Sequence, residues 1–448
     1  MSDPPIRPRE RDAIVQSLRA GVVPRTGQQH IQVGRVEEVK ALIGDLERIA
    51  DGGSAIRFVI GEFGSGKTFF LYLIRSIALE KRLVTLNADL TPDRRLQATG
   101  GQARALYQEL VRNMSTRSKP DGGALASVVE RFVSSSVEAS VARAVKPEVV
   151  IRERLAALSE MVNGYDFAEV ISAYWKGHDT GNETLKSDAI RWLRGEFATR
   201  TDARAALGVR TIVDDATAYD QLKLLAQFVR LAGFTGLVVC CDELVNLYKL
   251  ANTKARNTNY EQILRILNDC LQGTAVGLGF ILGGTPEFLL DTRKGLYSYQ
   301  ALQSRLAENQ FLKDGLVDYS GPVLRLANLT PEDLFVLLGR LRHVYAAGLP
   351  DRYLLPDEAL KAFMQHCSQR IGDAYFRTPR NSITAFVNLL AVLEQNADSS
   401  WQQLLEHVQV SVDTNPDLQP LENQEGDDGA ASGSEPAAGD DDLASFKL

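Results

Sequence analysis

Apolar positions along the chain fall into two patterns, short continuous runs and longer stretches with helical spacing. The runs lie at residues 56–60, 83–87, 237–241 and 277–282, and each is typical of a buried strand. Helical spacing recurs between them, for example at residues 36–49 and 260–271. Strands that alternate with helices predict an α/β fold with a parallel sheet flanked by helices.

Two blocks of the chain are predicted to be helical without strands. The first contains five periodic segments and no internal repeat: residues 127–137, 148–162, 166–175, 183–197 and 218–232. The second begins at Thr330-Pro331-Glu332, a strong N-cap signal, and continues with helices at 332–346, 356–367 and 379–395. We expect the first block to be an insertion carried on the sheet, and the second to be a small helical lid.

These patterns divide the chain into six parts. They are an N-terminal arm (1–30), a first part of a sheet domain (31–120), the helical insertion (121–230), a second part of the sheet domain (231–328), the lid (329–417) and an acidic tail (418–448). The tail is rich in Gly, Ala, Ser, Asp and Glu, so we expect it to be disordered. Its apolar tip, Leu443 to Leu448, is either incidental or a peptide that docks onto a partner.

The first strand leads into a P-loop, the pattern G-x-x-x-x-G-K-[ST] between a strand and a helix. Glycines in such a loop let backbone N–H groups surround phosphate oxygens, and the helix N-terminus adds partial positive charge. Lys67 is expected to reach the β- and γ-phosphates, and the Thr68 hydroxyl to bind Mg²⁺. The predicted nucleotide-binding residues are Gly61, Glu62, Phe63, Gly64, Ser65, Gly66, Lys67, Thr68 and Phe69.

A second acidic signal follows the strand at 237–241. Asp242 and Glu243 come directly after its five apolar residues, which makes a strand that ends in two acids by chance the weaker interpretation. Asp242 is expected to hold Mg²⁺, and Glu243 to polarise a water molecule for attack on the γ-phosphate. A carboxylate pair of this kind favours hydrolysis over binding alone.

Three further residues are candidates for catalysis. Thr285 follows the next strand, where its hydroxyl could orient the attacking water (sensor 1) or serve as an ordinary turn residue. Arg305 could reach a neighbouring subunit as an arginine finger or be a surface arginine, and Arg293 is a weaker competitor. Arg380 opens the last helix and could face the nucleotide (sensor 2), with Arg377 as the alternative.

Upstream of the P-loop, Val33-Gly34-Arg35 precedes a periodic helix. Such a segment is where AAA+ ATPases hold the adenine, although a loop and a packed helix would give the same pattern. A different ambiguity concerns residues 91–119, which hold six basic residues and two acids. A solvated helix face explains this bias better than a DNA-binding surface does.

Composition and charge exclude few functions. The chain has 448 residues, of which 44% are hydrophobic and 24% charged, and no apolar run is long enough to span a membrane. We expect a cytoplasmic protein, since its four cysteines lack metal-binding spacing and its N-terminus lacks an apolar signal. The net charge of −7 arises in the tail, so the remaining chain is near neutral and a nucleic-acid partner stays open.

The chain resembles the ATP-binding proteins of bacterial BREX and related phage-defence loci in five segments: Val33-Gly34-Arg35, Gly-Glu-Phe-Gly-Ser-Gly-Lys-Thr (61–68), Cys-Asp-Glu-Leu-Val-Asn-Leu (241–247), Gly-Gly-Thr-Pro-Glu (283–287) and Thr-Pro-Arg (378–380). Those proteins are AAA+-type ATPases distantly similar to origin-recognition initiators. The resemblance spans about residues 9–396 and the C-terminal tip. It does not extend to the winged-helix domain of the initiators, because residues 398–448 are too few for one.

The resemblance implies a specific function. It implies an AAA+-like ATPase that uses ATP and Mg²⁺ to drive conformational or assembly changes in an anti-phage complex. It also implies partners among other phage-defence proteins, including a DNA helicase, and a homo-oligomer if an arginine finger acts in trans. The alternative is a scaffold that binds ATP without hydrolysing it and docks partners through the insertion and tail. A P-loop kinase is disfavoured by the Asp242-Glu243 pair and by Thr285.

Overall fold

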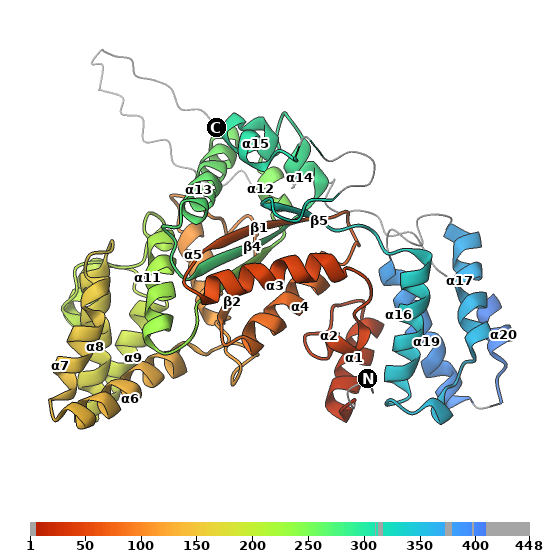
Figure 1. The fold of residues 1–448 in the computed structure, drawn as a ribbon, viewed down its shortest axis with the longest axis horizontal. Coiled ribbons are helices and arrows are strands. Elements are labelled where there is room, and N and C mark those ends of the chain that lie inside the picture. Colours follow the sequence, from red (N-terminus) through yellow and green to blue (C-terminus); the bar gives the residue numbers. More distant parts are fainter. Residues whose placement is uncertain (1–5, 310, 312–316, 372–378, 397, 409–448) are drawn as a thin grey trace, which may run out of the picture.

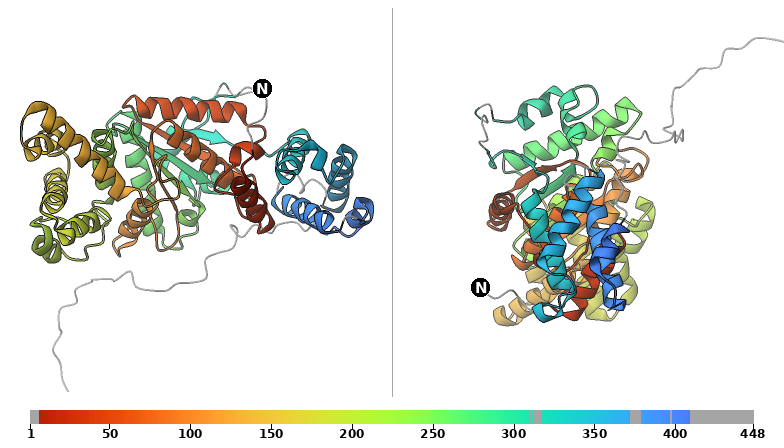
Figure 2. Two further views of the ribbon diagram at one scale, coloured as in Figure 1. Left: turned by 90° about the horizontal axis from the view of Figure 1, so that it is seen from below. Right: turned by 90° about the vertical axis from the view of Figure 1, so that its right-hand side faces the viewer.

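A computed structural model of the protein describes residues 6–309, 311, 317–371, 379–396 and 398–408 (Figure 1). Arg377 and the acidic tail lie outside these residues. A central sheet carries helices on both faces. A group of helices extends from each end of the molecule, so the overall shape is elongated (Figures 1 and 2).

Five parallel strands form the sheet, in the order β2-β3-β4-β1-β5. The strands are β1 (Ala55–Ile60), β2 (Val84–Asp89), β3 (Leu237–Asp242), β4 (Leu278–Gly284) and β5 (Val323–Arg325). The four predicted strands and the α/β class with a parallel sheet are confirmed. The fifth strand, β5, is a three-residue edge strand beside β1 that the sequence pattern did not predict.

Alternate residues of the strands pack against helices on opposite faces of the sheet. One face is covered by α3 (Val36–Ala50) and α4 (Lys67–Glu80), whose apolar residues surround Val59 and Val238. The other face, which includes Phe58 and Val239, packs against α5 (Gln102–Arg112), α11 (Ala218–Leu231) and α13 (Thr253–Leu271). Burial on both faces explains why the strands read as continuous apolar runs.

The helical insertion lies beside the β2 edge of the sheet, at the lower left of Figure 1. Before α11, its elements are α6 (Leu125–Arg143), α7 (Pro147–Leu155), η1 (Ala156–Leu158), α8 (Gly164–Thr180), α9 (Glu183–Leu193) and α10 (Arg200–Leu207). It shares an apolar cluster with the sheet. Phe228 of α11 links the two, because its ring centroid lies 5.1 Å from that of Phe132 and 5.4 Å from that of Phe167.

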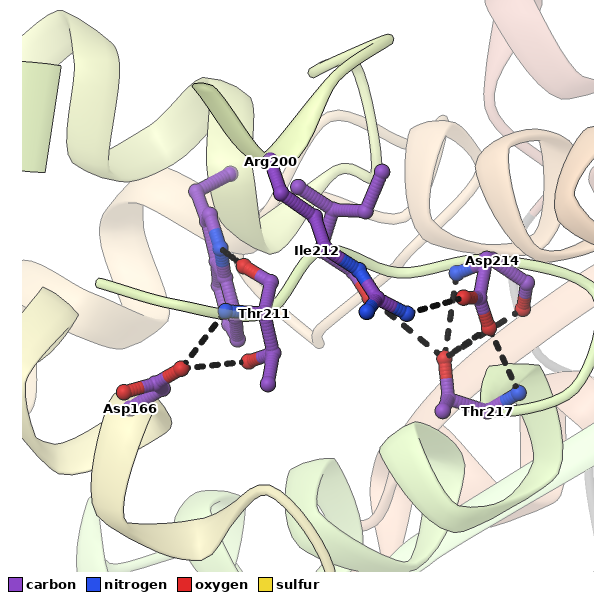
Figure 3. A network of polar contacts seen from close by, with 7 residues as sticks. Asp166, Arg200, Thr211, Ile212, Asp214 and Thr217 are labelled. Carbon is purple, nitrogen blue, oxygen red and sulfur yellow. Dashed lines mark hydrogen bonds and ion pairs between the residues drawn. The ribbon is translucent and has the colours of Figure 1, made fainter. Parts of the chain in front are cut away.

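A polar network fixes the segment that returns from the insertion to α11 (Figure 3). Asp166 accepts hydrogen bonds of 2.7 Å from both the backbone N–H and the hydroxyl of Thr211. The buried Trp192 indole donates to the Thr211 carbonyl at 2.7 Å, and the Thr217 hydroxyl donates to Asp214 at 2.8 Å. Trp175 and Trp192 are both buried, so neither is a platform for base stacking.

Short elements follow the strand ends and lead to the C-terminal helices. They are α12 (Val245–Tyr248), α14 (Pro286–Leu290), η2 (Leu296–Ser298) and α15 (Gln300–Leu306). The C-terminal group consists of α16 (Pro331–Tyr345), η3 (Pro350–Arg352), α17 (Asp357–Ile371), α19 (Pro379–Gln395) and α20 (Trp401–Glu406). None of the helices in the described residues is both long and apolar enough to cross a membrane.

The N-terminal arm packs against the C-terminal helices rather than standing apart. It contains α1 (Pro8–Arg19) and α2 (Gln28–Ile31), which lie between the sheet and α16 in Figure 1. Ile14 and Ile31 belong to the apolar cluster of the C-terminal helices. The first and last described parts of the chain therefore share one core.

Candidate functional site

The P-loop connects β1 to α4 at the carboxyl edge of the sheet. Gly64 and Gly66 have φ values of 77° and 83°, a left-handed conformation that is costly for other residues. Gly66 is the N-cap of α4, so Lys67 and Thr68 occupy the first helical turn. The Lys67 ammonium donates hydrogen bonds of 2.9 Å to the carbonyls of Gly61 and Glu62.

Thr68 connects the P-loop to the predicted carboxylate pair. Its hydroxyl donates a hydrogen bond of 2.7 Å to Oδ2 of Asp242, at the end of β3. Asp242 is only 7% exposed, and its other oxygen accepts a 2.9 Å hydrogen bond from the backbone N–H of Glu243. The two sequence signals therefore form one site.

Glu243 has an exposed side chain and a strained backbone. Its φ of 60° places a non-glycine residue in the left-handed region, and strain of this kind is concentrated at functional sites. The next residue is tied to β4, because the Leu244 N–H donates to the Gly283 carbonyl at 3.0 Å. This turn keeps Glu243 beside Asp242 on the wall of a cavity.

The strand β4 lies between β1 and β3 and brings Thr285 to the same edge. Thr285 is 2% exposed, lines the cavity and caps α14 through its hydroxyl, which accepts from the Phe288 N–H at 3.4 Å. The absence of a side chain at Gly283 leaves room for the Asp242 carboxylate, since a Cβ at position 283 would lie 2.3 Å from Oδ1 of Asp242.

At the end of β2, Asp89 stands in register with Asp242 on the neighbouring strand. Part of its side chain is exposed, yet enclosure by neighbouring atoms raises the pKa of Asp89, and the Asp242 carboxylate raises it further. A third carboxyl group therefore lies near the predicted pair.

A cavity of about 880 Å³ lies in front of this edge. Its floor consists of residues 63–68 together with Asp242, Glu243 and Thr285. Its other walls come from the N-terminal arm and the C-terminal helices, and many of their side chains are apolar: Val22, Val23, Ile31, Val33, Leu337 and Ile383. A floor that contains the P-loop, beneath apolar walls, suits a nucleoside triphosphate, whose base needs an apolar slot.

The donor atoms at this floor also fit a magnesium ion. Thr68 and Asp242 offer a hydroxyl and a carboxylate oxygen, and Mg²⁺ takes oxygen ligands, commonly one or two carboxylates with substrate phosphates. The buried hydroxyl of Ser65, in the same loop, has no hydrogen-bond partner among the described residues.

A comparison with known protein families shows which family the chain belongs to. A sequence profile described as BREX system ATP-binding protein BrxC/D matches residues 6–409. The chain belongs to the BrxC/D family of BREX system ATP-binding proteins. A search of curated proteins found no match.

Membership in this family confirms the resemblance inferred from the motifs and supports ATP as the ligand and a role in BREX defence. The matched range contains the arm, the sheet domain, the insertion and all the described C-terminal helices. Every residue that lines the cavity therefore lies within the matched range.

Several residues predicted to bind nucleotide lie away from the cavity surface. Gly34, Gly61 and Glu62 are not among its lining residues. Gly61 lies beneath the loop, where its carbonyl accepts from Lys67. Arg35 does line the cavity, but its guanidinium donates to the Ser65 carbonyl of the P-loop, and burial lowers its pKa.

The two catalytic arginine candidates differ in position. Arg380 lines the cavity, and its Nε donates to the Gly21 carbonyl of the arm at 2.5 Å. Arg305 is exposed on α15 outside the lining residues, where it donates to Asn268 at 2.9 Å and to the Ala301 carbonyl at 2.8 Å. Of these two arginines, only Arg380 lies where it could contact a nucleotide bound to the same chain.

Two contributions to the site were missed by the sequence prediction. Residues 21–26 of the arm and Leu337 of α16 line the cavity. Apolar side chains in a loop and on a helix give no local signal for a binding site. The basic stretch at 91–119 does not contribute to the lining, and three of its arginines form ion pairs, Arg94 and Arg112 with Glu109 and Arg117 with Glu80.

Proposed function

We propose that the chain is an ATPase that hydrolyses ATP in this cavity to drive conformational or assembly changes in a BREX defence complex. The contact between Thr68 and Asp242 carries the proposal, because it joins the P-loop to the acidic strand end. Family membership supports ATP binding, and the neighbouring Glu243 supports hydrolysis.

Each residue would have a distinct role in the reaction. Lys67 would bind the β- and γ-phosphates, and Thr68 and Asp242 would hold Mg²⁺. Glu243 would orient a water molecule and take its proton as the water oxygen bonds to the γ-phosphorus. The bond from that phosphorus to the β,γ-bridging oxygen breaks, giving ADP and phosphate. Thr285 would position the water from the adjacent strand.

Substitution of the base tests hydrolysis separately from binding. Glu243→Gln should retain ATP affinity and reduce phosphate release by at least about a hundredfold, since general-base catalysis contributes this much or more. Glu287→Gln, an exposed acid on α14, is the matched control and should leave turnover unchanged. Unchanged turnover in Glu243→Gln would refute the proposed mechanism. ATP binding without hydrolysis by the wild type, with or without DNA and the other BREX proteins, would favour the scaffold alternative.

The C-terminal helices and the two arginines fit an AAA+-like cycle. Arg380 faces the cavity from the start of α19, so the C-terminal helices could respond to the nucleotide as a lid. Arg305 is exposed and outside the cavity, a placement that allows it to act only on a neighbouring subunit. We infer that the active form is a homo-oligomer.

The remaining part of the proposal concerns partners. Membership in a BREX family implies other BREX proteins as partners. We propose that DNA is reached through a helicase partner and that the protein acts in the cytoplasm, where ATP is supplied. ATP turnover and sedimentation with and without double-stranded DNA test these points, because direct DNA coupling would change both in the isolated protein.

A further inference from the structure

The segment that leads from the sheet into the C-terminal helices runs beside the P-loop. This linker comprises residues 326–330, between β5 and α16. It begins with a backbone hydrogen bond of 2.7 Å from the Leu326 N–H to the Ile60 carbonyl, at the last residue of β1. Two polar contacts then connect it to the P-loop.

Asn328 makes the first contact. Its side-chain Nδ2 donates a hydrogen bond of 3.2 Å to Oε2 of Glu62, the second residue of the P-loop pattern. The Asn328 Oδ1 atom is buried and has no hydrogen-bond partner among the described residues. The contact to Glu62 therefore sets the orientation of this amide.

Arg35 makes the second contact. Its guanidinium donates to the Ser65 carbonyl in the P-loop and, at 3.3 Å, to the Ala327 carbonyl in the linker. Arg35 has a φ of 58°. A strained backbone is retained where surrounding contacts hold it, so the bridge is a fixed part of this site.

Glu62 is an unfavourable residue for a loop that binds a triphosphate. A carboxylate near bound phosphates repels them, and the effect is strong where water is excluded. The structure keeps this charge away, because residues 63–68 line the cavity while Glu62 does not, and its side chain is exposed. Its backbone carbonyl accepts a hydrogen bond from Lys67 at 2.9 Å.

We propose that Asn328 is a positioning residue for nucleotide binding, which holds the Glu62 carboxylate outside the phosphate site and ties the P-loop to the C-terminal helices. The proposal rests on the proposed function, in that the P-loop must bind ATP. It adds a residue from outside the known motifs. It also adds a route by which nucleotide occupancy reaches α16, which begins at Pro331, five residues after Leu326 and next to the capping residue Thr330.

An exchange of the two side chains tests the pair. Asn328→Asp places a carboxylate against Glu62 and should raise the Kd for ATP about tenfold, since hydrogen bonds to charged groups contribute about this much. Combining it with Glu62→Gln restores one amide donor and one carboxylate acceptor, so the Kd should return to within about threefold of the wild type. Glu62→Gln alone should bind at least as tightly as the wild type.

Binding is measured by titration with a fluorescent ATP analogue, and folding by circular dichroism. Asn396→Asp, an exposed exchange of the same type at the end of α19, is the control and should not change the Kd. Hydrogen exchange of α16 supplies a second readout. ATP should slow it in the wild type and in the exchanged pair, and much less in Asn328→Asp at saturating nucleotide.

Two results would overturn the proposal. One is an unchanged Kd in Asn328→Asp. The other is a loss of affinity that Glu62→Gln does not repair, which would assign Asn328 a purely structural role. Should Asn328→Asp not fold, Asn328→Ala removes the donor without adding charge and must still raise the Kd. Failure of ATP binding is distinguishable, because the wild type would then not bind the analogue at all, and failure of hydrolysis alone would leave these binding measurements unchanged.

Discussion

The hydroxyl of Thr68 donates a 2.7 Å hydrogen bond to the carboxylate of Asp242, although 174 positions separate the two residues. The intervening chain holds the whole helical insertion, yet both residues stand at the carboxyl edge of one parallel sheet. Carboxyl ends of parallel strands are where open α/β sheets bind ligands. The contact therefore brings together the hydroxyl and the carboxylate that we propose as magnesium ligands.

Removal of the Thr68 hydroxyl should weaken ATP binding only when magnesium is present. Thr68→Val keeps the side-chain shape but removes one oxygen ligand, so we expect the Kd for Mg-ATP to rise about tenfold, as for loss of a hydrogen bond to a charged group. Affinity for ATP in EDTA should not change. Calorimetric titration in the two buffers measures both values.

Thr258→Val provides the control for that substitution, since Thr258 lies on α13 and its hydroxyl donates only to its own helix, at the Ala255 carbonyl. Equal losses of affinity with and without magnesium would show that Thr68 supports the loop rather than the ion.

Arg305 should act on the site of a neighbouring subunit. Arg305→Ala should lower turnover by about a thousandfold, the scale of an arginine finger, while ATP affinity is kept. Lys67→Ala should abolish ATP binding in its own subunit, while its Arg305 can still reach the ATP site of a neighbouring subunit. Mixing the two inactive variants should therefore restore part of the phosphate release.

Arg293→Ala tests the weaker arginine-finger candidate in the same mixing experiment, because Arg293 is also exposed but follows α14. It should show wild-type turnover. If the mixture recovers no phosphate release and the protein sediments as a monomer, Arg305 does not act on a neighbouring subunit.

Local patterns sufficed to predict four strands of the sheet, the P-loop and the Asp242-Glu243 pair. Each buried strand is a continuous apolar run, and the P-loop glycines and the acids after β3 are defined within a few residues. Their proximity also follows from sequence, because parallel strands present their carboxyl ends at one edge. Thr285 reaches that edge for the same reason.

Relationships between distant segments were not predictable in this way. The strand β5 has three residues and exists through its pairing with β1. Packing of the arm against α16 and α19 depends on the shape of the core that they form together. The helical spacing around Ile14 would be the same whatever its side chain packed against. The contact of Asn328 with Glu62 joins two loops that carry no mutual signal.

The shared core of the arm and the C-terminal helices predicts a large effect of one truncation. Ile14 is fully buried against these helices, so Ile14→Ala should lower the free energy of unfolding by about 2–5 kcal/mol, the usual range for such cavities. Urea denaturation measures this change. Val392→Ala, at a 42% exposed position on α19, should cost less than about 1 kcal/mol. Equal costs would mean that the arm is not part of this core.

Alkaline pH should destabilise the protein through its buried thiols. Burial raises the pKa of Cys367 to about 12, as it does for Cys240 and Cys270. A cysteine thiol in the unfolded chain ionises with a pKa of about 8.5. Between these values the folded chain holds a proton that the unfolded chain has lost, so the stabilising contribution is complete below about pH 8.5 and is lost as pH rises toward 12.

Cys367→Ala isolates this effect, because it removes the titrating group and adds only a cost that does not vary with pH. The free energy of unfolding should fall less steeply with pH in the variant, by up to about 1.4 kcal/mol for each pH unit above 9. Urea titrations from pH 7 to 10 measure the two slopes. At about pH 8, folded wild type should react with iodoacetamide only slowly at Cys367, since the neutral, buried thiol is unreactive. Parallel slopes, or rapid alkylation of the folded protein, would show that Cys367 is open to solvent.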